Sequence, residues 1–349
     1  MVETITVQEA LKEEVQFLDT RSPAEFAIDH LPGALNIPIL SNDERAVVGT
    51  LYKQVSQDKA IEIGTEYIAK NMPEIMKVVN KVKNKKMVVY CWRGGMRSKV
   101  IVAFLESLKY NVFQLKGGHK AFRKYVRERL ENYDLKPKVV ILWGLTCVGK
   151  TDLLNKFHNS IDIEGLAQHN GSLYGAMGRE PNSQFRFDNL LLRKLDALKD
   201  EKCIITEGES RRIGDLMIPT FFYKKMLNGT HIFLTRSIEK RAQLCAAEYI
   251  NKKNKDEAIK ISASLQKVIS NKKKAEMVEM MEKGDYVSAS RILLEKYYDP
   301  LYENTLKRFN YSIEINTDDM SKAKEELEKF VKKNLINDNN SKKQYLFIF

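Results

Sequence analysis

A cysteine at the end of an apolar run is the first place in the sequence where chemistry could occur. The segment "KMVVYCWRGGMRS" (86–98) reads as a buried strand that ends at Cys91 and a helix that begins near Ser98. A glycine pair in such a loop allows a tight turn whose backbone N–H groups can hold an anion. Two arginines and the positive end of the following helix would favour the thiolate, which is the nucleophilic form of cysteine.

We therefore expect Cys91 to be a nucleophile. The predicted anion cradle consists of the six residues that follow it, Trp92, Arg93, Gly94, Gly95, Met96 and Arg97. The alternative is a buried structural cysteine, because free cysteine is among the most buried residue types. The position of the loop favours the functional interpretation, since open parallel sheets bind ligands outside the carboxyl ends of their strands.

A second motif predicts phosphate binding. "GLTCVGKT" (144–151) matches G-x-x-x-x-G-K-[ST], with a strand pattern, "KVVILW", before it and a helix pattern, "TDLLNKF", after it. In such a loop the backbone N–H groups hold phosphates, the lysine reaches a terminal phosphate and the threonine binds Mg²⁺. Cys147 is interpreted as a spacer. The predicted phosphate-binding residues are Gly144, Thr146, Cys147, Val148, Gly149, Lys150 and Thr151.

Polar residues after a later strand could complete the phosphate site. "KCIITEGES" ends with Glu207 and Glu209, and Glu207, the nearer to the strand, could hold Mg²⁺ together with Thr151. Arg211 and Arg212 follow, and they could clamp a phosphate, pair with these carboxylates or contact an RNA backbone. Arg179, in the glycine-rich stretch 169–182, could belong to a lid over the phosphate or to an ordinary surface loop.

The balance of charge favours a polyanionic partner. The formal net charge is +12, which suits nucleic acid, although lysine-rich solvated helix faces would give the same balance. In "KAFRKYVRER" (120–129) aromatic residues alternate with basic ones, a pattern that suits contact with nucleic acid. The residues expected to make this contact are Lys120, Arg123, Lys124 and Arg127.

The elements that must position these residues alternate between strands and helices, which predicts an α/β protein with parallel sheets. Among them we expect a helix over 63–84 and strands within 34–39 and 160–165. A length of 349 residues favours two domains, and the charged stretch "ENYDLKPK" (131–138) is the expected boundary. The expected parts are a first domain at 1–132, a linker at 133–138, a P-loop core at 139–236, a mainly helical part at 237–338 and a tail at 339–349.

Cysteine spacing and hydropathy indicate the compartment. The four cysteines lie far apart and form no C-x-x-C pair, which argues against a disulfide framework or a zinc site. No apolar run reaches the length needed to span a membrane. We therefore expect a cytoplasmic protein with no membrane partner.

Several of these segments resemble known families. "LDTRSPAEF", "DHLPGALNIP", the Cys91 loop and "LKGGHKAF" resemble rhodanese-type sulfurtransferases, in which Cys91 would carry a persulfide or perselenide. Asp19, Arg21, Glu25 and His30 fall in that signature, where we expect structural ion pairs and a turn; His119 could line the pocket or be a local cap. A rhodanese-like domain followed by a P-loop domain resembles the tRNA 2-selenouridine synthase family, as do "CWRGGMRS", "LAQHNGSLYG", "ESRRIG" and "YYDPLY".

The resemblance implies a substrate and co-substrates. The family acts on 2-thiouridine at the wobble position of tRNA, replaces sulfur with selenium from selenophosphate, and attaches a geranyl group from geranyl diphosphate. The implied partners are the tRNA anticodon region and the synthetase that makes selenophosphate. Two alternatives stay open: a sulfur-relay protein or thiosulfate sulfurtransferase whose second domain only binds a nucleotide, and a P-loop kinase with a regulatory rhodanese-like module.

Overall fold

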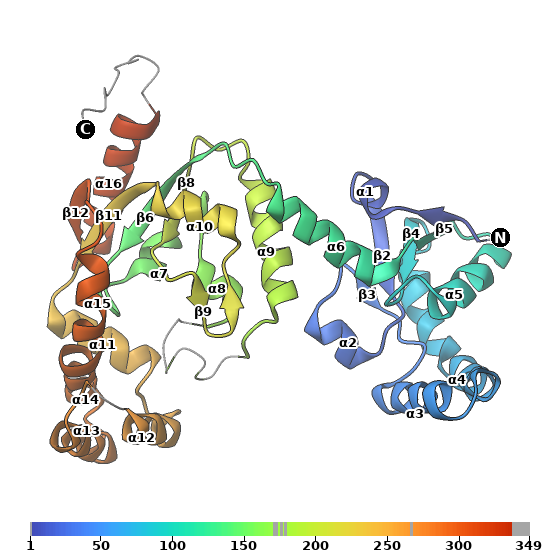
Figure 1. Ribbon diagram of the computed structural model, residues 1–349, viewed down its shortest axis with the longest axis horizontal. Helices are drawn as coiled ribbons and strands as arrows, with labels where there is room; N and C mark the ends of the chain where they lie inside the picture. Colours follow the sequence, from blue (N-terminus) through green and yellow to red (C-terminus); the bar gives the residue numbers. More distant parts are fainter. Residues whose placement is uncertain (1, 170–173, 175–176, 178–179, 266–267, 337–349) are drawn as a thin grey trace. The chain divides into compact units, whose positions relative to one another are not determined.

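The computed structural model describes residues 2–169, 174, 177, 180–265 and 268–336, and the chain in it divides into two compact units (Figure 1). The first is Met1–Asn132 and the second is Tyr133–Phe349. Each contains a five-stranded sheet in which all neighbouring strands pair in parallel. The predicted α/β class is therefore confirmed.

The sheet of the first unit has the strand order β1-β5-β4-β2-β3. Its central strand is fully buried from Met87 to Tyr90, as the apolar run "MVVY" predicts for a parallel strand covered on both faces. The strands are β1 (Thr4–Ile5), β2 (Val15–Asp19), β3 (Leu35–Asn36), β4 (Lys86–Tyr90) and β5 (Val112–Leu115). The helices are α1 (Val7–Ala10), α2 (Pro23–Ile28), α3 (Asn42–Gln54), α4 (Gln57–Val82), α5 (Met96–Ser107) and α6 (Gly118–Glu131).

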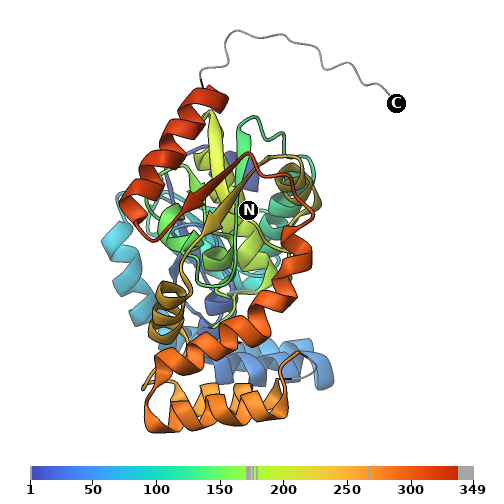
Figure 2. The same cartoon turned by 90° about the vertical axis from the view of Figure 1, so that its left-hand side faces the viewer.

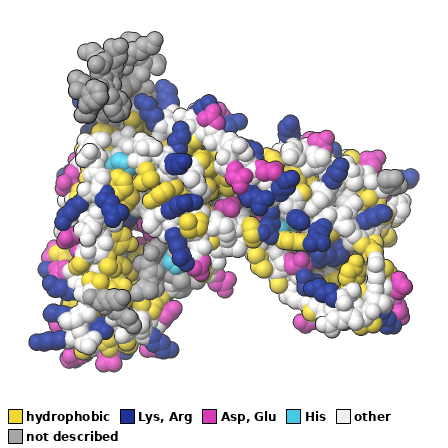
Figure 3. All heavy atoms as spheres, viewed as in Figure 1, with side chains coloured by type: hydrophobic (Ala, Val, Ile, Leu, Met, Phe, Trp, Pro, Cys, Tyr) yellow, Lys and Arg dark blue, Asp and Glu magenta, His cyan; other side chains and the backbone are white. Residues whose placement is uncertain are grey.

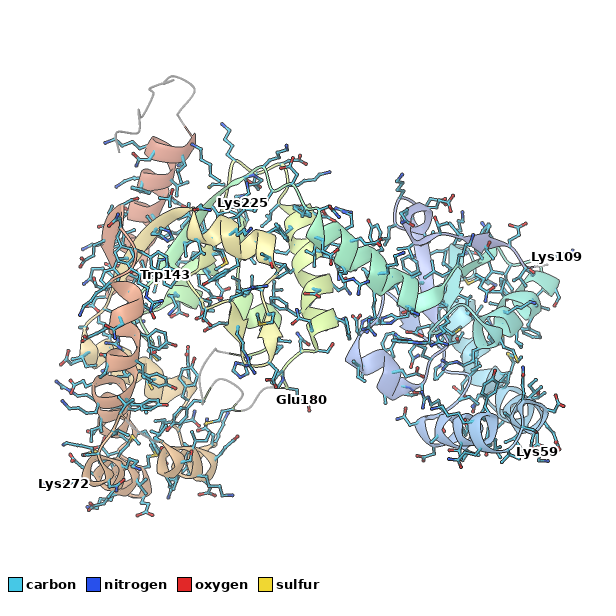
Figure 4. The ribbon with its side chains drawn as sticks, viewed as in Figure 1. Lys59, Lys109, Trp143, Glu180, Lys225 and Lys272 are labelled. Atoms are coloured by element: carbon cyan, nitrogen blue, oxygen red, sulfur yellow. The ribbon has the colours of Figure 1, made fainter. Side chains whose placement is uncertain are left out.

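The sheet of the second unit has the order β12-β11-β6-β8-β7, with the strand that leads into the P-loop at its centre. Its strands are β6 (Lys138–Trp143), β7 (Ser160–Ile161), β8 (Cys203–Glu207), β11 (Thr230–Thr235) and β12 (Ile313–Asn316). A separate antiparallel hairpin consists of β9 (Arg212–Ile213) and β10 (Leu216–Met217). Trp143, at the end of β6, lies inside this unit (Figure 4).

Helices surround this sheet and extend beyond it. Those within the α/β part are α7 (Lys150–Leu154), α8 (Ile163–Ala167), α9 (Gln184–Ala197), α10 (Thr220–Leu227) and α16 (Met320–Val331), the last followed by a π-helical turn, η2 (Lys332–Ile336). The others are α11 (Ile238–Glu248), α12 (Lys255–Ser264), α13 (Asn271–Lys283), α14 (Tyr286–Leu293), a π-helical turn η1 (Leu294–Tyr298) and α15 (Asp299–Leu306). In Figure 2 helices α12 to α14 are grouped at one end of the unit, where they share an apolar core. Of the helices that the structure describes, none is both long and apolar enough to cross a membrane.

Three of the expected elements differ from the structure. The helix expected over 63–84 begins earlier, at Gln57, and a second helix, α3, precedes it because Ser41 caps its first turn by accepting a hydrogen bond from the Glu44 N–H. The strand expected within 34–39 is limited to Leu35–Asn36. The strand expected within 160–165 ends at Ile161, because Asp162 accepts a hydrogen bond from the Gly165 N–H and starts helix α8.

Candidate functional site

Cys91 lies in the loop between β4 and α5, where its thiol is buried but well supplied with hydrogen-bond donors. The Gly95 N–H and the Ser98 hydroxyl both lie 3.3 Å from Cys91 Sγ. Burial alone would raise the pKa of the Cys91 thiol, but the hydrogen bond from Ser98, the charge of Arg97 and the Gly95 N–H outweigh it and lower that pKa. The loop therefore favours the thiolate, which is what a nucleophilic role requires.

The two arginines of the predicted cradle differ in their surroundings. Arg97 donates from Nη1 to Glu25 Oε2 at 3.0 Å, so an ion pair fixes its position beside the thiol. Arg93 is exposed, as is Met96, whereas Trp92 is half-buried. Of the two arginines, Arg97 is the one whose charge lowers the pKa of Cys91.

The Cys91 loop is interlocked with the turn that begins helix α6. The His119 N–H donates to the Cys91 carbonyl oxygen and the Lys120 N–H to the Trp92 carbonyl oxygen, each at 2.9 Å. Gly118 has a φ of +57°, and a Cβ added there would lie 2.3 Å from the Cys91 oxygen. Only glycine allows the two backbones to approach so closely, which gives a physical reason for Gly118.

Buried polar residues form ion pairs and hydrogen bonds next to the Cys91 loop. Arg21 donates from Nη2 to Asp19 Oδ2 at 2.6 Å and to the Asp29 carbonyl oxygen at 2.7 Å. His119 is buried, and its Nε2 lies 3.1 Å from Asp29 Oδ2. The short-range pairing of Arg21 with Asp19 matches the structural role expected of these residues. The contact of His119 with Asp29 spans 90 residues, and no local pattern in the sequence indicates it.

The P-loop has the backbone that phosphate binding needs. It runs from the end of β6 to the start of α7, with a φ of +90° at Gly149 and of +61° at Cys147. Lys150 begins the helix, and its ammonium donates to the Gly144 carbonyl oxygen at 3.3 Å, so it folds back over the loop. The hydrogen-bonded Cys245 thiol, together with burial, holds the pKa of Cys147 well above its usual range. A thiol that stays neutral agrees with a spacer better than with a second nucleophile.

A pocket of about 670 Å³, partly open to solvent, lies against this loop. One part of its lining is polar and consists of the P-loop from Thr146 to Asp152 with Glu164 and Glu209. The remainder comes mainly from apolar and aromatic side chains of the helical region, namely Tyr174, Leu244, Cys245, Tyr249, Leu293, Tyr298 and Tyr302, with Glu248 among them. The lining of the pocket therefore combines the P-loop with aromatic and apolar side chains of the helical region.

Carboxyl groups gather beside the P-loop. Glu207, at the end of β8, is fully buried; its Oε1 accepts from the Glu164 N–H at 2.8 Å, and its Oε2 has no hydrogen-bond partner in the described part of the chain. Burial and the charges of Glu207 and Glu209 raise the pKa of Glu164, and burial with the charge of Asp162 raises that of Glu207. A cation would relieve both effects.

These groups can be compared with what Mg²⁺ requires. No cluster of three or more His, Cys, Asp or Glu with metal-binding geometry occurs among the described residues. Mg²⁺ beside a P-loop needs fewer protein ligands, because phosphate oxygens and water complete its shell. The unpartnered Glu207 oxygen and the Thr151 hydroxyl fit such a cation. Glu164 and Glu209, rather than Glu207, line the described part of the pocket, and the sequence analysis did not predict Glu164.

Two domain families match the chain. Residues 137–283 match the tRNA 2-selenouridine synthase AAA domain, and residues 5–125 match the rhodanese-like domain. The tRNA 2-selenouridine synthase of Shewanella piezotolerans is 29% identical over 87% of this chain and 92% of its own length. That of Pseudomonas syringae pv. syringae is 29% identical over 83% of this chain and 88% of its own length. The chain belongs to the tRNA 2-selenouridine synthase family. The resemblance expected from the sequence is thereby confirmed.

Two solved structures are similar to smaller parts of this family member. The N-terminal domain of a proposed ATP/GTP binding protein of Clostridium difficile 630 is 39% identical over 36% of this chain and 98% of its own, with a TM-score of 0.35. A rhodanese-related protein of Thermoplasma volcanium is 21% identical over 35% of this chain and 92% of its own, with a TM-score of 0.23. The family assignment rests on the relatives that match over most of the chain.

The arginines expected to clamp phosphate have local partners in this member of the selenouridine synthase family. Arg211 donates to Thr220 Oγ1 at 2.8 Å, and Arg212 donates to Asp215 Oδ1 at 2.9 Å. Both lie at or beside the β9–β10 hairpin, and neither lines the described part of the pocket. Arg179 lies outside the described residues.

Two other arginines contact the P-loop, and the sequence analysis missed both. Arg241 is buried; it donates from Nε to the Thr146 carbonyl oxygen at 2.9 Å and pairs with Asp299. The guanidinium of Arg236 lies beside Gly149, where an added Cβ would be 3.1 Å from its Nη1. Both follow strand β11 in "TRSIEKR", a segment with no motif that would single them out.

The basic residues of helix α6 do not share one environment. The guanidinium carbon of Arg123 lies 5.2 Å from the centre of the Trp92 ring, at the edge of the cysteine loop. Arg127 and Lys124 are exposed and lie 3.9 Å from Glu131 and 3.6 Å from Glu128, respectively. Lys120 is exposed as well. On the face in Figure 3, Lys and Arg side chains are spread over both units.

Proposed function

We propose that this protein converts 2-thiouridine at the wobble position of tRNA into 2-selenouridine, by geranylation of the sulfur followed by its replacement with selenium. Selenophosphate is the selenium donor, and the reaction takes place in the cytoplasm, where four free cysteines are stable. One observation supports this proposal above others. The chain combines a thiolate-favouring loop at Cys91 with a P-loop pocket whose lining also includes aromatic and leucine side chains.

The pocket suits geranyl diphosphate. The P-loop and Lys150 would hold the diphosphate, and the branched apolar chain would lie along Leu244, Tyr249 and Tyr302, which line the pocket and are only partly buried. A nucleotide would also use the P-loop, but the tyrosine and leucine side chains favour an apolar group. Mg²⁺ held by Thr151 and Glu207 would neutralise charge on the diphosphate.

The first step is an alkylation. The sulfur of 2-thiouridine attacks the first carbon of the geranyl group, a carbon–sulfur bond forms, and the bond from that carbon to the diphosphate oxygen breaks. Negative charge builds up on the departing diphosphate. The Lys150 ammonium and the loop N–H groups stabilise it, because they are fixed in place before the reaction.

The second step replaces the alkylated sulfur, which is a better leaving group than the original thiocarbonyl sulfur. The selenium of selenophosphate bonds to C2 of the base, the bond from C2 to the geranylated sulfur breaks, and geranylthiol departs. Water then cleaves the selenium–phosphorus bond and releases phosphate, which leaves 2-selenouridine. The Cys91 loop is suited to hold the selenium donor, since the Gly95 N–H, the Ser98 hydroxyl and the Arg97 charge all favour an anion at this position. Selenophosphate would reach the loop from solution or from the synthetase that makes it.

Mass spectrometry of wobble nucleosides tests the proposal. Cells with and without the protein are compared, and the purified chain is given a 2-thiouridine anticodon stem-loop with geranyl diphosphate, with and without selenophosphate. We expect S-geranyl-2-thiouridine without selenophosphate and 2-selenouridine with it. Unchanged nucleosides together with thiosulfate sulfurtransferase activity would support a sulfur relay instead, and ATP turnover without geranyl transfer would support a kinase.

A further inference from the structure

Trp92 follows the reactive cysteine directly and packs against helix α6. Its ring centre lies 5.5 Å from that of His119 and 5.2 Å from the guanidinium carbon of Arg123. His119 and Arg123 are one helical turn apart, so both project from the same face of α6 and contact Trp92 from the helix side. The backbone is fixed too, because the Trp92 carbonyl oxygen accepts from the Lys120 N–H at 2.9 Å.

Trp92 is held in place by these contacts but is not fully buried. Trp92 is half-buried, whereas its neighbours Tyr90 and His119 are buried. Trp92 therefore keeps part of its surface accessible to solvent, directly after Cys91 in the chain. Rigid, partly exposed aromatic side chains are the usual surface on which proteins stack unpaired nucleobases.

Arg123 differs from the other basic residues of α6 in the groups that surround its guanidinium. Burial lowers the pKa of Arg123, and the Asp29 carboxylate acts in the opposite direction. Its half-buried guanidinium lies over Trp92, while that of Arg127, one turn further on, is exposed and near Glu131. Arg123 is therefore in contact with the indole ring, whereas Arg127 lies on the exposed side of the helix.

We propose that Trp92 is the surface on which the unpaired target uridine stacks as it approaches Cys91, and that Arg123 is a positioning residue that holds the Trp92 ring. This inference rests on the proposed function and names the residue that recognises its base. It also gives Arg123 a role different from the direct contact with nucleic acid that the sequence predicted.

Two anticodon stem-loop RNAs test the stacking. They are identical except at the wobble position, which is 2-thiouridine in one and abasic in the other. Their affinity for the full chain is measured for the wild type, Trp92→Phe and Trp92→Leu. Trp92→Leu should bind the thiouridine RNA about tenfold more weakly than the wild type does, because one stacked base is lost. The same variant should bind the abasic RNA with the affinity of the wild type. Trp92→Phe keeps an aromatic face and should lose only a few-fold.

A matched pair of arginine variants tests the positioning role. Arg123→Gln and Arg127→Gln remove the same charge one turn apart. Arg123→Gln should weaken binding of the thiouridine RNA more than that of the abasic RNA, and Arg123→Lys should do the same, because an ammonium lacks the planar face of the guanidinium. Arg127→Gln should weaken both RNAs equally and reduce the slope of log K against log salt by about one.

Tryptophan fluorescence provides a second measurement. The chain has two tryptophans, and the other, Trp143, is buried in the second unit. The thiouridine RNA should quench the wild-type emission, and Trp92→Phe should abolish that quenching.

The outcomes separate the inference from the function on which it rests. Equal losses on both RNAs in Trp92→Leu, or no preference of the wild type for the thiouridine RNA, would overturn the stacking. Unchanged alkylation of Cys91 by iodoacetamide in the variants shows that the loop is intact. A wild-type chain that modifies no wobble nucleoside contradicts the proposed function itself, whatever the stacking result.

Discussion

The α-carbon of Gly118 lies so close to Cys91 that a Cβ added to it would be 2.3 Å from the Cys91 carbonyl oxygen. Real Cβ atoms do not approach an oxygen so closely, so the reactive loop and the start of α6 depend on each other.

Gly118→Ala should destabilise the chain and disturb the cysteine loop. A positive φ alone costs about 1–2 kcal/mol for a residue with a Cβ, and the overlap with the Cys91 backbone adds about 1–3 kcal/mol. Gly33→Ala is the matched control, because Gly33 also has a positive φ, of +67°, but nothing lies within 4 Å of its added Cβ. Thermal melting should show the larger loss for Gly118→Ala. Equal losses of thermal stability in the two variants would mean that the Cys91 loop shifts to make room for the added Cβ.

Ser98→Ala should raise the pKa of the Cys91 thiol. The native pKa is lowered, so the wild type holds more thiolate at neutral pH than an ordinary cysteine, and loss of the Ser98 hydrogen bond reverses part of that shift. A hydrogen bond worth about 1 kcal/mol corresponds to about fivefold slower alkylation by iodoacetamide near pH 7. Ser107→Ala, at the far end of α5, is the control and should leave the pH profile in place.

Lys150→Ala should weaken binding of geranyl diphosphate. Loss of a charge-assisted contact to phosphate is worth about 1.5–3 kcal/mol, which is about 10- to 150-fold in affinity. Lys156→Ala is the control, because Lys156 is exposed just after α7 and is not among the residues that line the pocket in the described part of the chain. Isothermal titration would measure both variants. Equal affinities in the two would place the diphosphate elsewhere.

Cys91→Ser should stop the formation of 2-selenouridine but leave binding of the anticodon stem-loop within a few-fold. The hydroxyl that replaces the thiol has a far higher pKa and is not an anion at neutral pH, so it cannot take over the role of the thiolate. Formation of S-geranyl-2-thiouridine by the variant is the internal control, since that step uses the phosphate pocket. Full incorporation of selenium would show that the Cys91 thiolate is not needed for selenium transfer.

The sequence alone determined the local features of both sites. A buried apolar strand followed by glycines is a local pattern, so the loops that carry Cys91 and Lys150 could be placed from the residues themselves, and strand–helix alternation implied parallel sheets. The ion pair between Asp19 and Arg21 is also a local feature, because the two residues are only two positions apart in the chain.

Only the tertiary structure decided what surrounds these loops. Glu164, Tyr298 and Tyr302 line the phosphate pocket, His119 contacts Asp29, and Trp92 lies against Arg123, although each set is far apart in the chain. Such contacts depend on how the strands order in the sheet and on which helix faces pack together. Periodicity and spacing describe one segment at a time, so they cannot report which distant side chains the fold brings into contact.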